Sequence, residues 1–252
     1  MIGETLFKIG SLTIYTYGFF VMIAVLAASA IIYLLAKKNN LQRTVIFDLV
    51  IYTLLFGIIG ARITFYILYP DQFSSFWELF KIWQGGLVSW GGFITGLIAA
   101  VVVLKIYKEN VLEWMDILAI SGMLGLSIGR LGSFLSGELA GISHKGPFSI
   151  SGVYPATLFE SLLLLVLFFI WSILYLKFKS KIIPGAFGLG VLASYSLGRF
   201  LIDFSRQESD IFAEISLGQL TSLVILILSI VVFIIFIISK KKGPENVASR
   251  NN

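Results

Sequence analysis

The sequence contains no cysteine and a single histidine, His144, in 252 residues. The chain therefore has no disulfide, no thiolate metal site and no cysteine nucleophile of its own, and a histidine-rich metal site is not expected. Charged residues are also scarce, at 13%, whereas 58% of the residues are hydrophobic and the mean hydropathy is +0.94. A soluble domain needs more polar surface than this, so the composition predicts a multi-span membrane protein. We expect neither a metal, nor another cofactor, nor a nucleic acid partner.

Seven hydrophobic segments follow one another along the chain, at residues 11–36, 47–69, 87–104, 111–128, 155–176, 184–204 and 217–239. Most reach the length of about 20 apolar residues that crosses the hydrocarbon core of a bilayer. The third and fourth are short, which also allows a re-entrant or protein-buried path. The first lacks the basic start, short apolar core and cleavage site of a signal peptide. The expected fold is therefore an all-α integral membrane protein with seven transmembrane helices.

Basic residues collect on one side of these expected spans. Twelve of the 19 follow the first, third, fifth and seventh segments: Lys37, Lys38, Arg43, Lys105, Lys108, Lys177, Lys179, Lys181, Lys240, Lys241, Lys242 and Arg250. The positive-inside rule makes this side cytoplasmic. The amino terminus is then expected outside and the carboxyl terminus in the cytoplasm, with the acidic loop 206–214 (Glu208, Asp210, Glu214) outside.

We expect a single domain over residues 1–239 and a basic, then polar, cytoplasmic tail over residues 240–252 that is disordered. Attraction to anionic headgroups and a stop-transfer flank explain the tail lysines equally well. Two longer loops, 70–86 and 130–154, fall on the outer side. The first contains Trp77 and Trp83, which predicts a short amphipathic helix over residues 73–83 at the membrane interface.

Several charged residues lie within or beside the apolar segments: Arg62, Arg130, Glu138, Glu160, Arg199, Asp203 and Arg206. A charge inside the membrane costs at least about 2.5–3.5 kcal/mol on insertion scales, so such side chains should face the bundle interior or a wet cavity. Tyr195, Arg199, Asp203 and Arg206 are spaced four, four and three residues apart and share one helical face. A structural ion pair between Arg199 and Asp203 is one interpretation, and the wall of a binding site is another.

The four arginines of this set outnumber the carboxylates available to pair with them. Guanidinium groups stay charged and bind phosphate through two nitrogen atoms, so the excess favours an amphiphile with an anionic head, such as a phospholipid. The stretch GRLGSFLSGELAG at residues 129–141 adds glycines that let backbone N–H groups approach an anion. We interpret it as a headgroup loop in which Arg130 binds phosphate and Glu138 holds an arginine or a hydroxyl. A structured outer loop with one ion pair is the alternative.

The stretch 129–141 resembles the signature of the prolipoprotein diacylglyceryl transferases, a family of seven-span bacterial membrane enzymes, and the similarity runs over nearly the whole chain. The family signature reads glycine, arginine, any residue, glycine, asparagine, phenylalanine, any residue, asparagine, glycine, glutamate. Ser133 and Ser136 replace its two asparagines here. Other matching positions are Tyr17-Gly18, Arg62 after Gly60, the stretch 84–89, and Tyr195, Arg199, Asp203 and Arg206 in the sixth segment.

The resemblance implies an enzyme that transfers the diacylglyceryl group of phosphatidylglycerol to the lipobox cysteine thiol of a prolipoprotein and releases glycerol phosphate. It implies the bacterial cytoplasmic (inner) membrane as the location. Phosphatidylglycerol, the prolipoprotein signal peptide and membrane lipids are the implied partners. The implied catalytic residues are Arg130, Arg199, Glu138 and Tyr17. The implied substrate-binding residues are Arg62, Ser133, Ser136, Gly137, Gly141, Trp90, Tyr195, Asp203, Arg206 and Glu160.

Two histidines of the family are replaced here, by Trp90 before Gly91-Gly92 and by Tyr154 before Pro155, and Ile142 replaces a family arginine. A thiol with a pKa of about 8.5 is partly ionised without a base, and Tyr17, Glu138 or His144 could act instead. His144 is equally consistent with a solvated loop histidine. The alternative function is a relative that binds or handles phospholipid without thiol transfer, or that uses a different acceptor.

Overall fold

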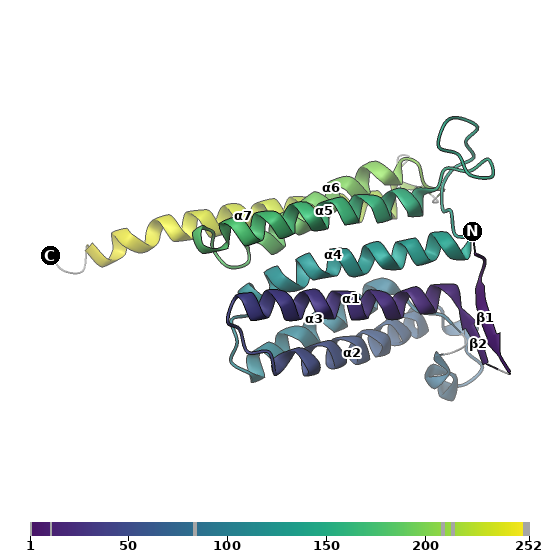
Figure 1. Ribbon diagram of the computed structural model, residues 1–252, viewed down its shortest axis with the longest axis horizontal. Helices are drawn as coiled ribbons and strands as arrows, with labels where there is room; N and C mark the ends of the chain where they lie inside the picture. The colour runs from purple at the N-terminus through teal and green to yellow at the C-terminus, as the bar shows by residue number, and fades with distance from the viewer. Residues whose placement is uncertain (1, 11, 83–84, 208–209, 213–214, 249–252) are drawn as a thin grey trace. The chain divides into compact units, whose positions relative to one another are not determined.

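The computed structural model describes residues 2–10, 12–82, 85–207, 210–212 and 215–248. The chain forms two compact units, residues 1–31 with 115–252 and residues 32–114. The α-helices of the described residues are α1 (Thr16–Lys38), α2 (Val45–Leu68), α3 (Ser89–Ile106), α4 (Val111–Ser136), α5 (Ala156–Phe178), α6 (Ala186–Asp203) and α7 (Leu217–Ala248) (Figure 1). The short elements are β1 (Thr5–Ile9), β2 (Leu12–Tyr15), β3 (Asp210–Phe212), β4 (Ile215–Ser216) and the 3-10 helices η1 (Pro70–Gln72), η2 (Phe76–Phe80) and η4 (Lys179–Lys181).

Each hydrophobic segment of the sequence overlaps one α-helix of the described residues. Among the described residues, six helices are long and apolar enough to cross a membrane: α1, α2, α3, α4, α5 with η4, and α7. α6 is not one of these six, and it carries Arg199 and Asp203 in its last two turns. The chain is therefore a mostly helical membrane protein. A single domain over residues 1–239 stays a prediction.

Three boundaries differ from the expectation. The first helix begins only at Thr16, because residues 5–15 form the antiparallel hairpin β1–β2, in which Phe7 pairs with Ile14 and Ile9 with Leu12. The fourth helix continues past Gly129 and Gly132 to Ser136, so a loop beginning at residue 130 was the wrong prediction. The seventh helix runs to Ala248, so the prediction of a disordered tail is wrong as far as that residue. Residues 249–252 lie outside the described residues.

The expected helix over residues 73–83 is present in part, as the five-residue 3-10 helix η2 (Phe76–Phe80), and it does not extend over the whole expected range. The 3-10 helix η1 precedes it. Phe76, Trp77 and Phe80 of η2 are all exposed, as expected of an interfacial aromatic group. Trp83 and Gln84, and in the acidic loop Glu208 and Glu214, lie outside the described residues.

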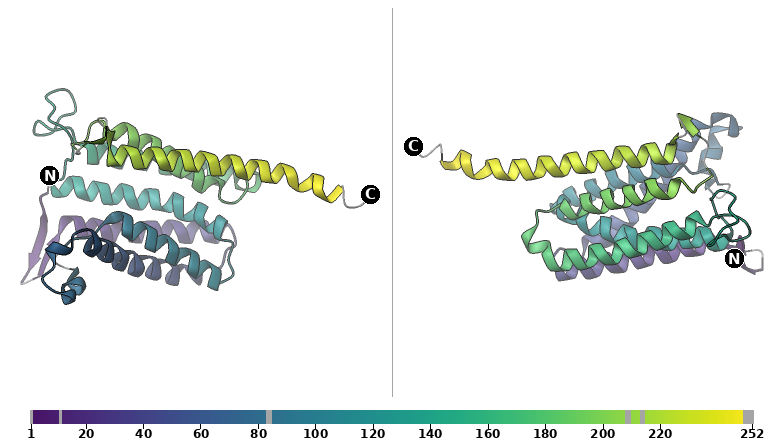
Figure 2. Two further views of the ribbon diagram at one scale, coloured as in Figure 1. Left: turned by 180° about the vertical axis from the view of Figure 1, so that it is seen from behind. Right: turned by 90° about the horizontal axis from the view of Figure 1, so that it is seen from above.

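In the first unit, small and polar residues bring the helices close together. Ser127 of α4 and Ser161 of α5 are buried, and each hydroxyl donates to the backbone carbonyl of the other residue at 2.8 Å. On α6, a Cβ at Gly190 or Gly198 would overlap Trp171 or Leu163 of α5. Close backbone approach through small residues, with hydroxyl groups bonded across the interface, is the usual way in which membrane helices pack. α5, α6 and α7 accordingly lie side by side (Figures 1 and 2).

Asp116 of α4 fixes the start of α6. Its carboxylate is 3% exposed and accepts hydrogen bonds from the backbone N–H groups of Gly185, at 2.8 Å, and Gly188, at 2.6 Å. The first N–H groups of a helix have no partner within the helix, and negative charge is stabilising at that end. Gly185 precedes the helix with φ at +90°, a conformation that favours glycine.

The second unit is built on α2 and α3. Gly57 and Gly60 of α2 face Gly91, Gly92 and Gly96 of α3, and a Cβ at Gly60 or Gly91 would overlap a threonine of the other helix. The hydroxyl of Thr95 donates to the carbonyls of Phe56 and Gly91, at 2.9 and 2.8 Å. Val88, just before α3, donates its backbone N–H to Ala61 at 3.1 Å. These contacts place the start of α3 beside Arg62.

We expect Asp116→Ala to lower the free energy of unfolding by about 2–3 kcal/mol, because it leaves buried N–H groups of α6 without their charged acceptor. Asp116→Asn, which keeps one acceptor oxygen, should cost less. Thermal unfolding in detergent, followed by circular dichroism, measures the effect. Asp71→Ala, which removes an exposed carboxylate in η1, is the control. Equal stability of Asp116→Ala and this control would contradict the assignment.

Candidate active site

The carboxylate of Glu160 is the centre of a buried polar cluster in the first unit. Glu160 lies in the second turn of α5 and is 0% exposed. Its Oε2 accepts hydrogen bonds from Nη1 of Arg199, at 2.6 Å, and Nη1 of Arg206, at 3.3 Å. Its Oε1 accepts one from the Tyr195 hydroxyl, at 2.9 Å, and lies 3.1 Å from Nε of Arg130. One buried carboxylate thus contacts side chains from α4, α6 and the segment after α6.

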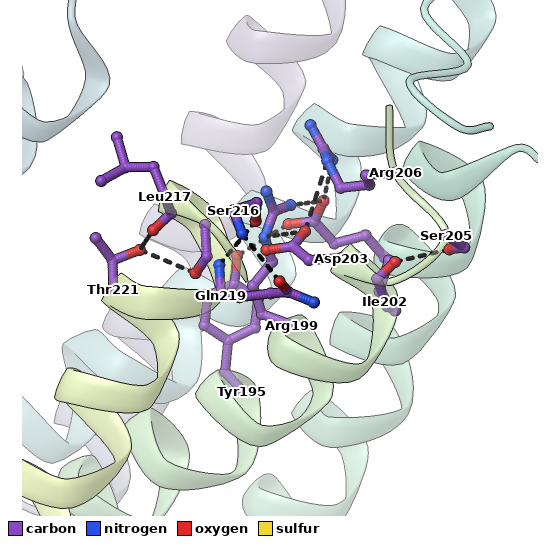
Figure 3. Close-up of polar contacts among 12 residues, drawn as sticks. Tyr195, Arg199, Ile202, Asp203, Ser205, Arg206, Ser216, Leu217, Gln219 and Thr221 are labelled. Carbon is purple, nitrogen blue, oxygen red and sulfur yellow. Dashed lines mark hydrogen bonds and ion pairs between the residues drawn. The ribbon is translucent and has the colours of Figure 1, made fainter. Parts of the chain in front are cut away.

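Asp203 is the second carboxylate of the cluster. Its Oδ1 lies 3.0 Å from Nε of Arg199 and 3.6 Å from Nε of Arg206 (Figure 3). The structural pair between Arg199 and Asp203 that the sequence allowed is therefore present, but within a larger network. We call Arg130, Glu160, Arg199, Asp203 and Arg206 the arginine cluster. Three guanidinium groups against two carboxylates leave it with one formal positive charge.

The three arginines differ in exposure. The side chain of Arg130 is 31% exposed, that of Arg199 13% and that of Arg206 10%. Arg130 is thus the one that a ligand outside the cluster reaches first. Buried guanidinium groups in a medium of low dielectric constant interact strongly with an anion, and their planar geometry suits phosphate oxygens.

Several local structures hold these side chains in place. The reciprocal bonds of Ser127 and Ser161 join α4 to α5 three residues before Arg130 and one residue after Glu160. The spacing of Tyr195, Arg199 and Asp203 places all three on one face of α6. At the start of α7, which packs along α6, Ser216 and Gln219 form a buried capping box, with bonds of 3.0 and 3.1 Å between the backbone N–H of each residue and the side chain of the other (Figure 3).

Arg206 lies after α6 and is held through its backbone. Gly141 and Arg206 form an antiparallel bridge, flanked by bonds from Ile142 N–H to Ser205 O, at 3.0 Å, and from Gln207 N–H to Ala140 O, at 3.2 Å. Gly141 is buried, and a Cβ there would overlap the carbonyl oxygen of Tyr154. Gly141 therefore has a structural reason to be glycine. A direct contact of this residue with substrate stays a prediction.

The glycine and the glutamate of the signature, Gly137 and Glu138, lie directly after the end of α4. Gly137 has φ at +112°, its N–H bonds to Phe134 O at 3.1 Å, and the N–H of Glu138 bonds to Ser133 O at 3.0 Å. This is the Schellman motif, which ends a helix with a glycine in a left-handed conformation. Ser133 is buried, and Ser136 donates to its carbonyl at 2.8 Å.

Residues 129–136 of the stretch are therefore helical and residues 137–141 lie beyond the helix, so the prediction of one loop was wrong. Headgroup binding by the stretch stays a prediction. Glu138 is exposed beyond the cap, and its carbonyl accepts a bond from the Thr157 hydroxyl at 2.6 Å. The sequence suggested that Glu138 holds an arginine. In the structure Glu160, from an apolar helix 22 residues further on, makes those contacts. The catalytic role of Glu138 stays a prediction.

Tyr17 also belongs to the first unit, but it is not a member of the arginine cluster. Together with Gly18 it lines a cavity of about 410 Å³, whose other lining residues are Glu4, Tyr15 and Ser136. The match of Tyr17-Gly18 and the second signature serine to the family thus coincides with proximity in space. Glu4 and Tyr15 were not among the candidates, because the hairpin that carries them was not expected. In the sequence, Gly10 lies between two segments with β-branched residues, and this pattern could have revealed the hairpin. In the structure Gly10 has φ at +59°.

Arg62 belongs to the second unit and is 5% exposed. Its guanidinium donates to five backbone carbonyls, those of Glu78 (2.7 Å), Leu79 (3.0 Å), Lys81 (3.3 Å), Gly86 (3.1 Å) and Gly85. The Phe73 ring lies 4.8 Å from its Cζ. These bonds use the N–H groups that a phosphate would need, so Arg62 organises the loop in this structure. Substrate binding by Arg62 stays a prediction.

The same loop carries Glu78, a carboxylate whose pKa is lowered by its neighbours. The backbone N–H of Ser74 donates to Glu78 Oε2 at 2.9 Å, and Lys81 Nζ lies 3.4 Å from Oε1. The Ser74 hydrogen bond lowers the pKa of Glu78 from its ordinary value, and the hydrogen bond and charge of Lys81 add to this effect against a smaller opposing effect of desolvation. The carboxylate stays ionised and braces the loop from which Arg62 takes its acceptors.

The remaining candidates, Trp90 and His144, make aromatic contacts. Trp90, in the first turn of α3 in the second unit, is 45% exposed and packs against Phe93 with ring centroids 6.4 Å apart. His144 packs edge-on against Tyr154, with centroids 6.0 Å apart, and Tyr154 stacks on Phe159 at 4.7 Å. His144 therefore belongs to an aromatic group of the loop after α4. Among the described residues no group of histidines and carboxylates has the arrangement of a metal site.

Comparison with known proteins identifies the family of the chain. The sequence profile of the prolipoprotein diacylglyceryl transferase family matches residues 4–235. Among similar proteins, phosphatidylglycerol–prolipoprotein diacylglyceryl transferase 1 of Clostridium perfringens is 34% identical over 96% of this chain and 97% of its own. The corresponding transferases of Oceanobacillus iheyensis and Listeria monocytogenes (strain HCC23) are 32% and 30% identical, over 96% and 90% of this chain and 89% and 87% of theirs. The resemblance seen in the sequence is confirmed, and the chain belongs to the prolipoprotein diacylglyceryl transferase family.

Proposed function

We propose that this chain transfers the diacylglyceryl group of phosphatidylglycerol to the lipobox cysteine thiol of a prolipoprotein and releases glycerol phosphate. The observation that carries the proposal is the arginine cluster, a buried group with one formal positive charge and an accessible Arg130. The chain's membership of the transferase family supports the same reaction. The substrates are those named by its relatives, phosphatidylglycerol and a prolipoprotein.

The charges of this reaction suit the cluster. The phosphodiester of phosphatidylglycerol carries one negative charge. When sulfur attacks the glyceryl carbon and the carbon–oxygen bond to phosphate breaks, the leaving phosphomonoester gains a second. Positioned donors that meet the developing charge stabilise the transition state more than the ground state. Arg130 and Arg199 supply those donors in our proposal, with Arg206 behind them, and Glu160 and Tyr195 keep their orientation.

The positions of the basic residues support an outer location for this chemistry. Lys177 lies in the last turn of α5, and Glu160 lies about 26 Å nearer the start of the same helix. Lysines at helix ends favour the cytoplasmic side. The cluster then lies in the outer half of a bacterial cytoplasmic membrane, with seven spans, an outer amino terminus and a cytoplasmic carboxyl terminus. Ser133, Ser136, Gly137, Gly141 and Asp203 stay candidate contacts of the substrates in this proposal.

The first test compares the wild type with Arg130→Ala and Arg199→Ala in phosphatidylglycerol micelles with a lipobox peptide. Glycerol phosphate release and the mass of the peptide are followed. We expect each variant to lose about 100-fold or more in rate, the typical cost of removing one donor to a developing anion. Arg43→Ala is the matched control, because Arg43 is an exposed arginine whose Nη1 donates to Tyr33 at 3.2 Å in the second unit.

Full activity in both cluster variants would refute the proposal. A wild type that releases no glycerol phosphate, but retains phosphatidylglycerol on purification and loses it in Arg130→Ala, would identify a lipid-binding relative without thiol transfer. Transfer to another acceptor would appear as glycerol phosphate release with no gain in peptide mass.

A second test addresses Glu160. Glu160→Gln leaves three guanidinium groups facing one carboxylate, and breaking a buried ion pair typically costs about 3–5 kcal/mol. We expect Glu160→Gln to have a lower midpoint of thermal unfolding and little transfer activity. Glu160→Asp, which keeps the charge, should lie between Glu160→Gln and the wild type in both measurements. Glycerol phosphate added to Glu160→Gln should raise the midpoint more than it does for the wild type, because the anion replaces part of the lost charge. Unchanged stability of Glu160→Gln would show that the cluster does not depend on this carboxylate.

A further inference from the structure

The proposed reaction has to remove a proton from the substrate thiol, and the arginine cluster offers no acceptor for it. Both oxygens of Glu160 contact cationic or hydroxyl groups, and Glu160 is fully buried. Asp203 is 4% exposed and lies against two arginines. These carboxylates are therefore already engaged with the cations of the cluster, and a base for the thiol is expected elsewhere in the chain.

The cavity beside Tyr17 contains a suitable group. Of the residues that line it, Glu4 supplies a carboxylate, and Tyr15 and Tyr17 supply hydroxyl groups. The other lining residues are Gly18 and Ser136. Phenols are protonated near neutral pH and donate hydrogen bonds, whereas an ionised carboxylate only accepts them. The volume of about 410 Å³ is in the usual range of ligand-binding sites.

The backbone around Glu4 is fixed, although its side chain is exposed. The N–H groups of Ile2 and Gly3 donate to Leu135 O at the end of α4, at 2.9 and 3.1 Å. Thr16, at the start of α1, donates its N–H to Glu4 O at 2.9 Å and its hydroxyl to Gly3 O at 2.6 Å. The segment before the hairpin is thus tied to two helices, and Glu4 is held beside Ser136.

The cavity and Arg130 lie at the same end of α4, because Ser136 follows Arg130 by about 9 Å of helix rise. The proposal places the phosphate of the lipid at Arg130 and the thiol of the peptide in the cavity. Glu138 and His144 do not line this cavity in the described structure.

We propose that Glu4 is the catalytic base that accepts the proton of the substrate thiol, an assignment that rests on the proposed function. The sulfur–carbon bond forms as the carbon–oxygen bond to phosphate breaks. The thiol proton passes to the Glu4 carboxylate, and the electron pair of the broken bond leaves with the phosphomonoester. The Tyr17 hydroxyl donates to the developing thiolate. Glycerol phosphate later carries the proton away or releases it to water, which restores the carboxylate.

The test is the pH dependence of glycerol phosphate release by the wild type, Glu4→Gln and Glu4→Asp with a lipobox peptide. We expect Glu4→Gln to lose about 100-fold at pH 7, a typical contribution of a general base. Its rate should approach that of the wild type near pH 9, because a thiol with a pKa of about 8.5 is then ionised without help. Glu4→Asp should keep the shape of the wild-type profile. Asp71→Asn, at an exposed carboxylate outside the cavity, should match the wild type.

The outcomes separate this inference from the proposed function. If the wild type turns over and Glu4→Gln has the same rate at every pH, the inference is overturned and the function stands. A loss in Glu4→Gln by one constant factor from pH 6 to pH 9, with an unchanged midpoint of thermal unfolding, also overturns it, because removal of a base is rescued by alkali. A wild type without turnover overturns the proposed function and this inference together.

Discussion

The arrangement of the first unit depends on one buried charge. Glu160 is a carboxylate in an apolar helix, with no exposure to solvent, and its position is tolerable only because cationic and hydroxyl groups from α4, α6 and the segment after α6 converge on it. The converse also holds, since each arginine of the cluster would be costly in an apolar bundle without that carboxylate. The reciprocal serine bonds, the Schellman cap and the Gly141–Arg206 bridge all bring chain segments to this point.

Such a network of buried ion pairs adds little to the stability of the fold, but it orients the side chains that form it. Replacing buried ion pairs by well-packed apolar groups is often neutral or stabilising in other proteins, so their presence calls for another reason. Here the carboxylates set the directions of the guanidinium groups before any ligand arrives, and they leave one positive charge uncompensated. Preorganised donors of this kind need no rearrangement as charge develops in a reaction.

The sequence predicted the positions of all seven helices, because the length of an apolar segment reflects the thickness of the bilayer and needs no knowledge of contacts. It also grouped Tyr195, Arg199 and Asp203 correctly, because helical periodicity is local. It misjudged the features that depend on tertiary contacts. The loop after the fourth segment was expected to begin near residue 130, but α4 continues to Ser136, and Gly132 packs inside it against Phe20 of α1.

The partners of the charged residues were the least predictable part. Glu138 is the nearest carboxylate to Arg130 in the signature, yet a helix cap turns it outward and Glu160 takes its place. Arg62 looked like a fourth anion-binding group, but a loop that folds back onto it supplies carbonyl acceptors that no spacing rule reveals. The resemblance to the family, which the comparisons confirmed, located the right residues without specifying which of them touch.

The cluster also has a consequence for the synthesis and membrane insertion of the protein. Its members are synthesised in a fixed order, with Arg130 first, Glu160 one helix later, and Arg199, Asp203 and Arg206 last. The end of α4 therefore enters the bilayer with a cation whose counter-charge is still inside the ribosome or the translocation machinery. It settles stably only when α5 follows as the second half of a helical hairpin, and Glu160 in turn gains its other partners when α6 arrives. Membrane insertion of this unit is thereby coupled across three successive helices, and a pause in translation between α5 and α6 would leave the carboxylate with Arg130 as its sole cationic partner from the cluster.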